Sequence, residues 1–230
     1  IVIGGIFVFL TRKQLTLGSG DVWQSVWSSV VKAGLKRMDQ KEMHKRSWEP
    51  NILLFSGETD DRPHLIEFSK VLAGRLGMIS NFDLIETPDS KVLFPKHLQS
   101  VRDNEVIEQG IFARRQECSN IFKGVEMIAS TYGFSGIDPN TVLMGWGRNT
   151  TDPVLFSEMT TRLSELDYNV LYLDYDQKRG FGNYAKIDLW WSSFSKECEF
   201  MLSLVKLVQT SNNWRNAQFR VLMINNQNEQ

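Results

Sequence analysis

The loop that begins at Gly145 carries the residue types best suited to binding an anion. It reads Gly145-Trp146-Gly147-Arg148-Asn149-Thr150. Its two glycines allow a ligand to approach the backbone closely, and its arginine supplies positive charge. Asp152-Pro153 then predicts the start of a helix, whose first N–H groups also favour an anion. Because the loop lacks a third glycine or a lysine-serine pair, we expect at most a weak anion site at Gly145, Gly147 and Arg148, with a tight turn exposing polar residues as the alternative.

Two acidic segments are weaker candidates for a functional site. The loop Gly57-Glu58-Thr59-Asp60-Asp61 has one glycine and three carboxylates, which makes it a poor cradle for a phosphate. Asp174 and Asp176 flank Tyr175, and strand alternation places both carboxylates on one side. Paired carboxylates can bind a metal or act in acid–base chemistry, but no third ligand accompanies this pair. We therefore expect it to be a solvated strand end.

The remaining reactive side chains are isolated along the chain. The three histidines, His44, His64 and His97, lie far apart, and the two cysteines show no metal-ligand spacing. Cys118 and Cys198 lie in apolar surroundings typical of buried free thiols. No nucleophile-elbow motif occurs either. We expect no catalytic constellation, no cofactor and no metal, and hence a protein that is not an enzyme.

The length, composition and net charge describe a globular chain without a general attraction to nucleic acid. It has 230 residues, of which 42% are hydrophobic, and 26 basic residues nearly balance 27 acidic ones. This composition can bury a substantial core. Electrostatic attachment to a partner must therefore come from a local patch, and nucleic acid is not an expected partner.

The first 17 residues predict an association with a membrane. Ile1–Leu10 is entirely apolar or glycine, and Arg12 and Lys13 come soon after it. About 20 residues are needed to cross a bilayer, so this run fits the last half of a transmembrane helix. The basic residues after it predict that the rest of the chain lies on the cytoplasmic side of the cell membrane. A buried strand is the alternative.

Residues 18–47 predict an amphipathic, basic linker helix. Asp21 is a plausible N-cap, and Trp23, Val26, Trp27 and Val30 come after it at helical spacing. Basic residues dominate the second half: Lys32, Lys36, Arg37, Lys41, Lys45 and Arg46. Such a helix suits a membrane surface or a partner helix, with Trp23, Val26, Trp27 and Val30 as interface candidates. Packing on the core of its own domain is the alternative.

Residues 48–230 predict one α/β domain. Apolar runs typical of strands alternate with segments of helical periodicity, which indicates a mostly parallel, Rossmann-like sheet with helices on both faces. The expected arrangement resembles that of the universal stress proteins. The expected strands are 51–56, 78–86, 111–118, 141–145, 169–174, 186–191 and 219–224. The first helix should begin at Arg62-Pro63, bury Leu76 and end at Gly77. The short connection before 186–191 allows that strand to pair antiparallel.

Several runs, in order, resemble the cytosolic C-terminal domain of the cation–chloride cotransporter family, which includes the Na-K-Cl and K-Cl cotransporters. They are Trp48-Glu49-Pro50-Asn51-Ile52-Leu53-Leu54, Asp61-Arg62-Pro63, Gly77-Met78-Ile79-Ser80, Gly136-Ile137-Asp138-Pro139-Asn140-Thr141-Val142-Leu143-Met144-Gly145-Trp146, Ile187-Asp188-Leu189-Trp190-Trp191, and Trp214-Arg215 with Phe219-Arg220-Val221. The tryptophan helix resembles the family's linker after the last transmembrane segment.

The resemblance implies a cytosolic regulatory and dimerisation domain on a transporter of the amino acid–polyamine–organocation type. Such a transporter moves chloride with sodium or potassium through its membrane part, so no ion-binding residue carries over. The implied partners are that transmembrane part, the membrane surface and a second copy of the chain. Members usually continue into a second α/β lobe after the last matched strand. The alternative is a nucleotide-binding regulatory protein resembling the universal stress proteins.

Overall fold

The computed structural model describes residues 19–39, 49–57, 62–95, 99–100, 110–133, 137–147, 150, 152–191 and 196–223. The chain divides into two units. One comprises Ile1–His44 with Phe134–Ile137, and the other comprises Lys45–Gly133 with Asp138–Gln230.

The first unit contains a single described helix, α2 (Ser19–Asp39). It begins two residues before Asp21, so Asp21 lies inside the helix rather than at its N-cap. The indoles of Trp23 and Trp27 are each 63% exposed, and Val30 is also exposed, whereas Val26 is partly buried. Where the structure is described, no helix has the length and apolar character needed to cross a bilayer. The apolar run 1–10 lies outside the described residues.

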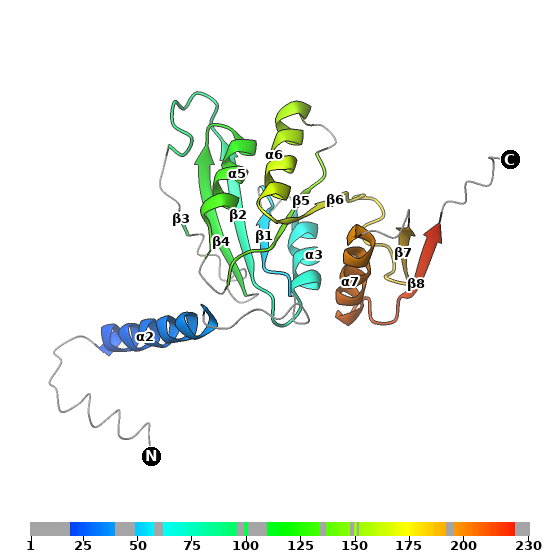
Figure 1. Cartoon of the computed structure of the whole chain (residues 1–230), viewed down its shortest axis with the longest axis horizontal. Coiled ribbons are helices and arrows are strands. Elements are labelled where there is room, and N and C mark those ends of the chain that lie inside the picture. Colours follow the sequence, from blue (N-terminus) through cyan, green and yellow to red (C-terminus); the bar gives the residue numbers. More distant parts are fainter. Residues whose placement is uncertain are drawn as a thin grey trace, which may run out of the picture. The chain divides into compact units, whose positions relative to one another are not determined.

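The second unit is built on a six-stranded sheet in the order β3-β4-β2-β1-β5-β6 (Figure 1). Its strands are β1 (Ile52–Phe55), β2 (Ile79–Glu86), β3 (Gln99–Ser100), β4 (Ile111–Cys118), β5 (Thr141–Gly145) and β6 (Asn169–Leu173). Five strands are parallel, and the short β3 pairs antiparallel with the edge of β4. This confirms the predicted α/β class with a mostly parallel, Rossmann-like sheet.

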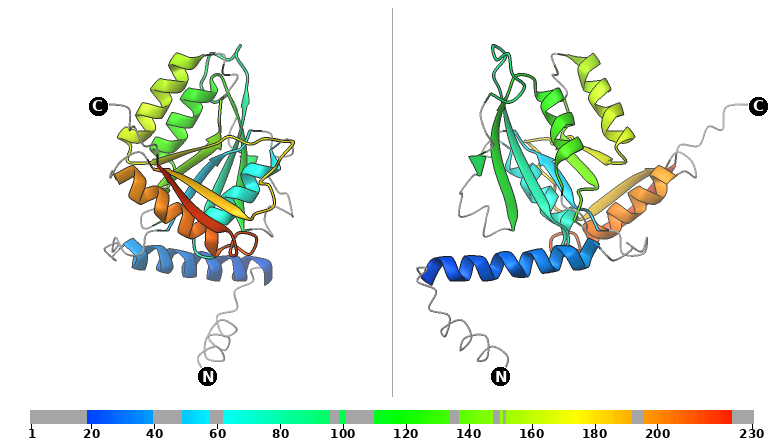
Figure 2. Two further views of the ribbon diagram at one scale, coloured as in Figure 1. Left: turned by 90° about the vertical axis from the view of Figure 1, so that its right-hand side faces the viewer. Right: turned by 60° about the vertical axis from the view of Figure 1, so that its left-hand side comes forward.

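Helices cover both faces of this sheet, because alternate residues of each central strand point to opposite sides. Leu53 and Phe55 of β1 face α5 (Ile121–Thr131) and α6 (Pro153–Glu165). These two helices lie side by side (Figure 2). Ile52 and Leu54 face α3 (Pro63–Ala73) and α7 (Lys196–Thr210). The central strand is therefore buried on both faces, as its continuous apolar run predicted.

The order of the strands creates a switch point between β1 and β5. The chain leaves β1 into α3 on one face of the sheet, and it leaves β5 into α6 on the opposite face. The two loops therefore diverge, and the space between them lies beyond the carboxyl ends of the strands. Ligands of open parallel sheets bind at this place.

The last two strands form a sheet of their own. β7 (Lys186–Trp191) and β8 (Gln218–Met223) pair in parallel and are joined by α7. The expectation that residues 186–191 could pair antiparallel is therefore wrong. The pairing is set by the connection after β7 and not by the one before it. The crossover through α7 brings the chain back so that β8 runs in the same direction as β7. α7 also packs on α3 through Leu204 and Val208.

Helix α3 is shorter than predicted. It ends at Ala73, because Gly74 adopts a positive φ of 59° and its N–H bonds to the carbonyl of Lys70. Leu76, expected in the core stripe, is 74% exposed. Gly77 has a different role from the predicted helix stop: its N–H donates to the carbonyl of Ala73, 2.9 Å away, in the turn that leads into β2.

Candidate functional site

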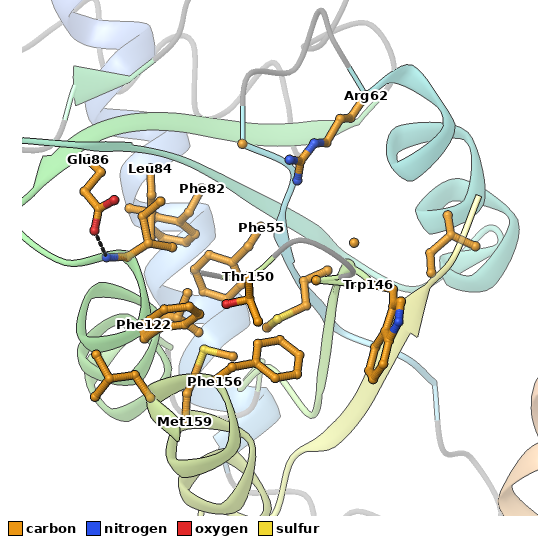
Figure 3. A pocket seen from close by; sticks show the side chains of 18 of the residues that line it. Phe55, Arg62, Phe82, Leu84, Glu86, Phe122, Trp146, Thr150, Phe156 and Met159 are labelled. Carbon is orange, nitrogen blue, oxygen red and sulfur yellow. Dashed lines mark hydrogen bonds between the residues drawn. The ribbon is translucent and has the colours of Figure 1, made fainter. Parts of the chain in front are cut away.

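A cleft of about 1050 Å³ opens at the carboxyl ends of β1, β2, β5 and β6. Its walls come from these strands, from the first turns of α5 and α6, and from the segments that come directly after β1 and β6. Figure 3 shows Phe55, Phe122 and Phe156 around a common space, with the side chain of Arg62 at another side of it. The cleft therefore occupies the switch point that the topology creates.

The floor of the cleft is apolar and aromatic. Phe55 and Phe82 come from adjacent strands, with ring centroids 6.1 Å apart. Phe156 of α6 lies 5.8 Å from Trp146, edge to face, and 6.2 Å from Phe122 of α5. Such pairs fix ring positions beyond what area burial alone achieves. Trp146 is half exposed, so an apolar ligand could contact its ring.

Arg62 brings positive charge to this apolar space. A Cβ built on Gly57 would lie 3.6 Å from Arg62 Nη1, and one built on Gly145 would lie 3.5 Å from the same atom. The guanidinium therefore lies across the ends of β1 and β5, close to two residues without side chains. Within the described part of the chain, no carboxylate forms a salt bridge with it.

The helix termini around the cleft differ in their capping. Asn120 Oδ1 accepts from Lys123 N at the start of α5, and Asp152 Oδ1 accepts from Leu155 N at the start of α6, each at 3.0 Å. No side chain caps the start of α3, next to Arg62. The carboxylate of Asp152 would repel an anion at the start of α6. The start of α3 is therefore the more favourable of these helix termini for binding an anion.

Acidic side chains line the other parts of the cleft. Glu86 Oε1 accepts from Ile121 N at 3.4 Å, a bond drawn in Figure 3, and Asp174 also faces the cleft. Asp176 turns away: it accepts from Lys178 N at 2.9 Å and lies 3.8 Å from the Arg179 guanidinium. Asp174 and Asp176 therefore have separate surroundings. No group of three or more metal-ligating side chains gathers among the described residues.

His64 stacks on the ring of Tyr175 at the rim of the cleft. The ring centroids lie 4.1 Å apart and the planes are parallel to within 1°. Burial lowers the pKa of His64 below its ordinary value of 6.5, and the charge of Arg62 lowers it further. The hydroxyls on the cleft wall belong to Thr150 and Tyr175, and Thr150 Oγ1 donates to the carbonyl of Asp152. Among the described residues, neither of these hydroxyls forms a hydrogen bond with a histidine or a carboxylate side chain.

The structure brings together only part of the predicted anion loop. Gly145 and Gly147 line the cleft, whereas Arg148 lies outside the described residues, as do His44 and His97. Among the described residues of the cleft, the positive charge comes from Arg62, which the sequence analysis named only as the start of a helix and not as a site residue. Its position in the sequence could have identified it. Arg62 comes after the first strand and just before Pro63, and the loop that leaves a neighbouring parallel strand would lie beside it.

Comparison with known proteins supports the fold. No protein-family model matches the sequence. Among solved structures, the chain is similar to the cytoplasmic domain of a prokaryotic cation chloride cotransporter, with a TM-score of 0.55 and 16% sequence identity. The match covers 76% of this chain and 66% of that one. This chain therefore shares the α/β fold of that cytoplasmic domain and spans about two thirds of its length.

Proposed function

We propose that this chain is a cytosolic regulatory and assembly domain of a membrane cation–chloride cotransporter. The transporter would move chloride with sodium or potassium, and transport itself would occur in a transmembrane part. The observation that carries the proposal is the likeness to a cotransporter's cytoplasmic domain over 76% of the chain. The ordered motifs from Trp48 to Val221 support it independently.

The size and location of the native protein test this proposal. Cells of the source organism are fractionated and probed with an antibody raised against this chain. We expect a membrane band, released by detergent and not by carbonate, far heavier than the 26.5 kDa of this chain. A band of about that mass in the supernatant would contradict the proposal.

We further propose that α2 contributes an interface, either to a second copy or to the membrane surface. Its apolar residues Trp23, Trp27 and Val30 are exposed, and its last turn carries Lys36 and Arg37. Exposed tryptophans beside basic residues favour an anionic bilayer or the apolar face of a partner helix.

Paired charge substitutions test the α2 interface. Replacing Trp23 and Trp27 with glutamate should lower dimer affinity in sedimentation equilibrium, or flotation with anionic vesicles. Gln24→Glu with Ser28→Glu is the matched control, because it adds the same charge on another face of the helix. Equal behaviour of the two double variants would remove α2 from the interface.

The cleft supports a second candidate, a nucleotide-binding regulatory protein. The observation that favours it is the guanidinium of Arg62 at the switch point, which has no salt bridge among the described residues and lies beside an aromatic floor. Calorimetry with ATP should then show micromolar binding that Arg62→Ala abolishes. Arg162→Ala on α6, where Arg162 pairs with Glu165 on the surface, is the control. We expect no hydrolysis in either case, since we propose a binding function and not an enzymatic one.

A further inference from the structure

The segment between β6 and β7, residues 174–185, is termed the strap. Its first residues, Asp174, Tyr175 and Gln177, line the cleft. Its last residue, Ala185, accepts a hydrogen bond from Gln218 N at the start of β8. A single short segment therefore runs from the wall of the cleft to the part of the same domain formed by β7, α7 and β8, which is termed the β7–α7–β8 unit.

Aromatic side chains form a continuous chain of contacts along the strap. Tyr175 stacks on His64 at one end and lies 5.0 Å from Phe181. The ring of Phe181 also lies near that of Trp214, in the turn between α7 and β8, with 6.4 Å between the centroids. Phe181 also stacks on Phe68 of α3, with 6.0 Å between the centroids. Tyr175 and Trp214 thus share Phe181 as a neighbour.

The backbone of the strap is held in an uncommon shape. Tyr184 has a φ of 56°, a conformation that costs a non-glycine residue about 1 kcal/mol or more. Two contacts compensate: its hydroxyl lies 3.0 Å from Glu67 Oε1, and its ring meets Trp214 edge to face at 5.0 Å. A shift of Trp214 would therefore remove one support of this conformation.

The β7–α7–β8 unit is attached to the larger sheet by apolar packing and not by pairing of strands. Its two strands form a separate sheet, with no hydrogen-bonded partner among the six described strands of the larger one. α7 packs on α3, and Val208 of α7 is buried in the same cluster as Ile52 and Leu143. Ile187 of β7 and Trp214 also pack against this cluster. The strap therefore adds its aromatic contacts to this packing, as a second link between the unit and the rest of the domain.

We propose that the strap couples the cleft to the β7–α7–β8 unit, so that a change at Tyr175 alters how firmly that unit is held. A ligand that displaced the His64–Tyr175 stack would then loosen α7 and β8. This inference adds a mechanism to the regulatory function proposed above, and the biological role of the coupling rests on that function. The coupling itself is a property of the chain and can be measured without a ligand.

Hydrogen exchange measured by mass spectrometry tests the coupling on the whole chain. Tyr175→Ala should raise exchange in peptides from α7 and β8 about 2- to 10-fold, the range expected for the loss of an aromatic contact. Peptides from β1 and β2 should not change. Phe112→Ala is the matched control, since Phe112 is an exposed ring on β4 away from the strap.

A second variant separates transmission through Phe181 from a local effect. In a Phe181→Ala background, Tyr175→Ala should add nothing further to exchange in α7, because the shared neighbour is already gone. Additive effects would overturn the proposal, as would a change confined to the strap and the first turn of α3.

The conservative variant Tyr175→Leu covers the case in which the alanine variant misfolds. It keeps an apolar side chain but removes the stack, so it should still loosen α7 and β8 alone. Loss of protection throughout the chain in this variant as well would make Tyr175 a core residue and overturn the coupling. Cell fractionation tests the transporter assignment separately, so failure of one proposal is distinguishable from failure of the other.

Discussion

Asn51 and Asn140 bind each other's backbone at the amino ends of β1 and β5. Asn140 Oδ1 accepts from Asn51 N at 3.1 Å, and the carbonyl of Asn51 accepts from Asn140 N at 3.0 Å. Asn140 Nδ2 also donates to the carbonyl of Glu49 at 2.8 Å, and its own carbonyl accepts from Asn169 N at 2.9 Å. The Pro-Asn-Thr run that marks the family resemblance therefore joins the amino ends of β1 and β5, at the end of the sheet opposite the cleft.

Removing Asn140 should destabilise the sheet. Asn140→Ala leaves Asn51 N and the carbonyl of Glu49 without their side-chain partners, and we expect a loss of about 2–4 kcal/mol in the free energy of unfolding. Urea denaturation measures it. Asn183→Ala is the control, because the Asn183 side chain accepts an exposed bond from Ala185 N at 3.3 Å. A loss no greater than that of the control would show that the Asn140 contacts contribute little.

Acid should destabilise the chain partly through His64. Burial and then the charge of Arg62 lower the pKa of His64 in the folded chain, so the unfolded chain binds a proton first as the pH falls. The stability that the neutral ring contributes is present above the ordinary histidine pKa of about 6.5 and is lost as the pH falls through it. His64→Gln should therefore show a smaller fall in Tm between about pH 7.5 and about pH 5.5, which bracket that value. Identical pH slopes for the two proteins would contradict this role.

Both thiols should be inert in the folded chain. Burial raises the pKa of Cys118 to about 11, with the Glu86 carboxylate adding to the shift. Cys198 is also buried. At about pH 8 we expect native Cys118, isolated as the Cys198→Ala variant, to react with a thiol reagent on the order of 100-fold more slowly than a free thiol. Full reaction should occur in denaturant, whereas rapid reaction of the native chain would show that the site opens.

Gly77 should not tolerate a side chain. A Cβ there would lie 2.6 Å from the carbonyl oxygen of Ala73 and in contact with that of Pro50, and both are backbone atoms. Gly77→Ala should therefore cost about 3 kcal/mol or more, measured by urea denaturation. Gly34→Ala on α2 is the control, because no atom lies within 4 Å of the position that its Cβ would take. Similar stability of the two variants would mean that the turn before β2 relaxes easily.

The five parallel strands of the larger sheet were predictable because each carries a local signal, whereas the two-residue strand β3 was not predicted. The bounds expected for residues 111–118 and 141–145 agree with β4 and β5, and Asp152 caps α6 as its pairing with Pro153 predicted. A continuous apolar run or a capping residue identifies an element without reference to its neighbours.

The partners of the elements were not predictable in the same way. The pattern of residues 186–191 indicated a strand, but its pairing with β8 depends on a crossover that local periodicity does not encode. Arg62 was missed for a related reason. Its loop was judged by its own acidic residues, whereas the position of Arg62 in the cleft depends on β5, which lies beside β1 only in space.

The position of β1 at the centre of the sheet has a consequence for synthesis. Ile52 pairs with Ile79 of β2 on one side and with Thr141 of β5 on the other, and β5 is translated much later than β2. A nascent chain therefore holds the apolar strand β1 with one edge unpaired until β5 emerges from the ribosome. Such an edge can pair with the wrong strand. The growing chain should accordingly need the protection of a chaperone most during the interval between the synthesis of β2 and that of β5.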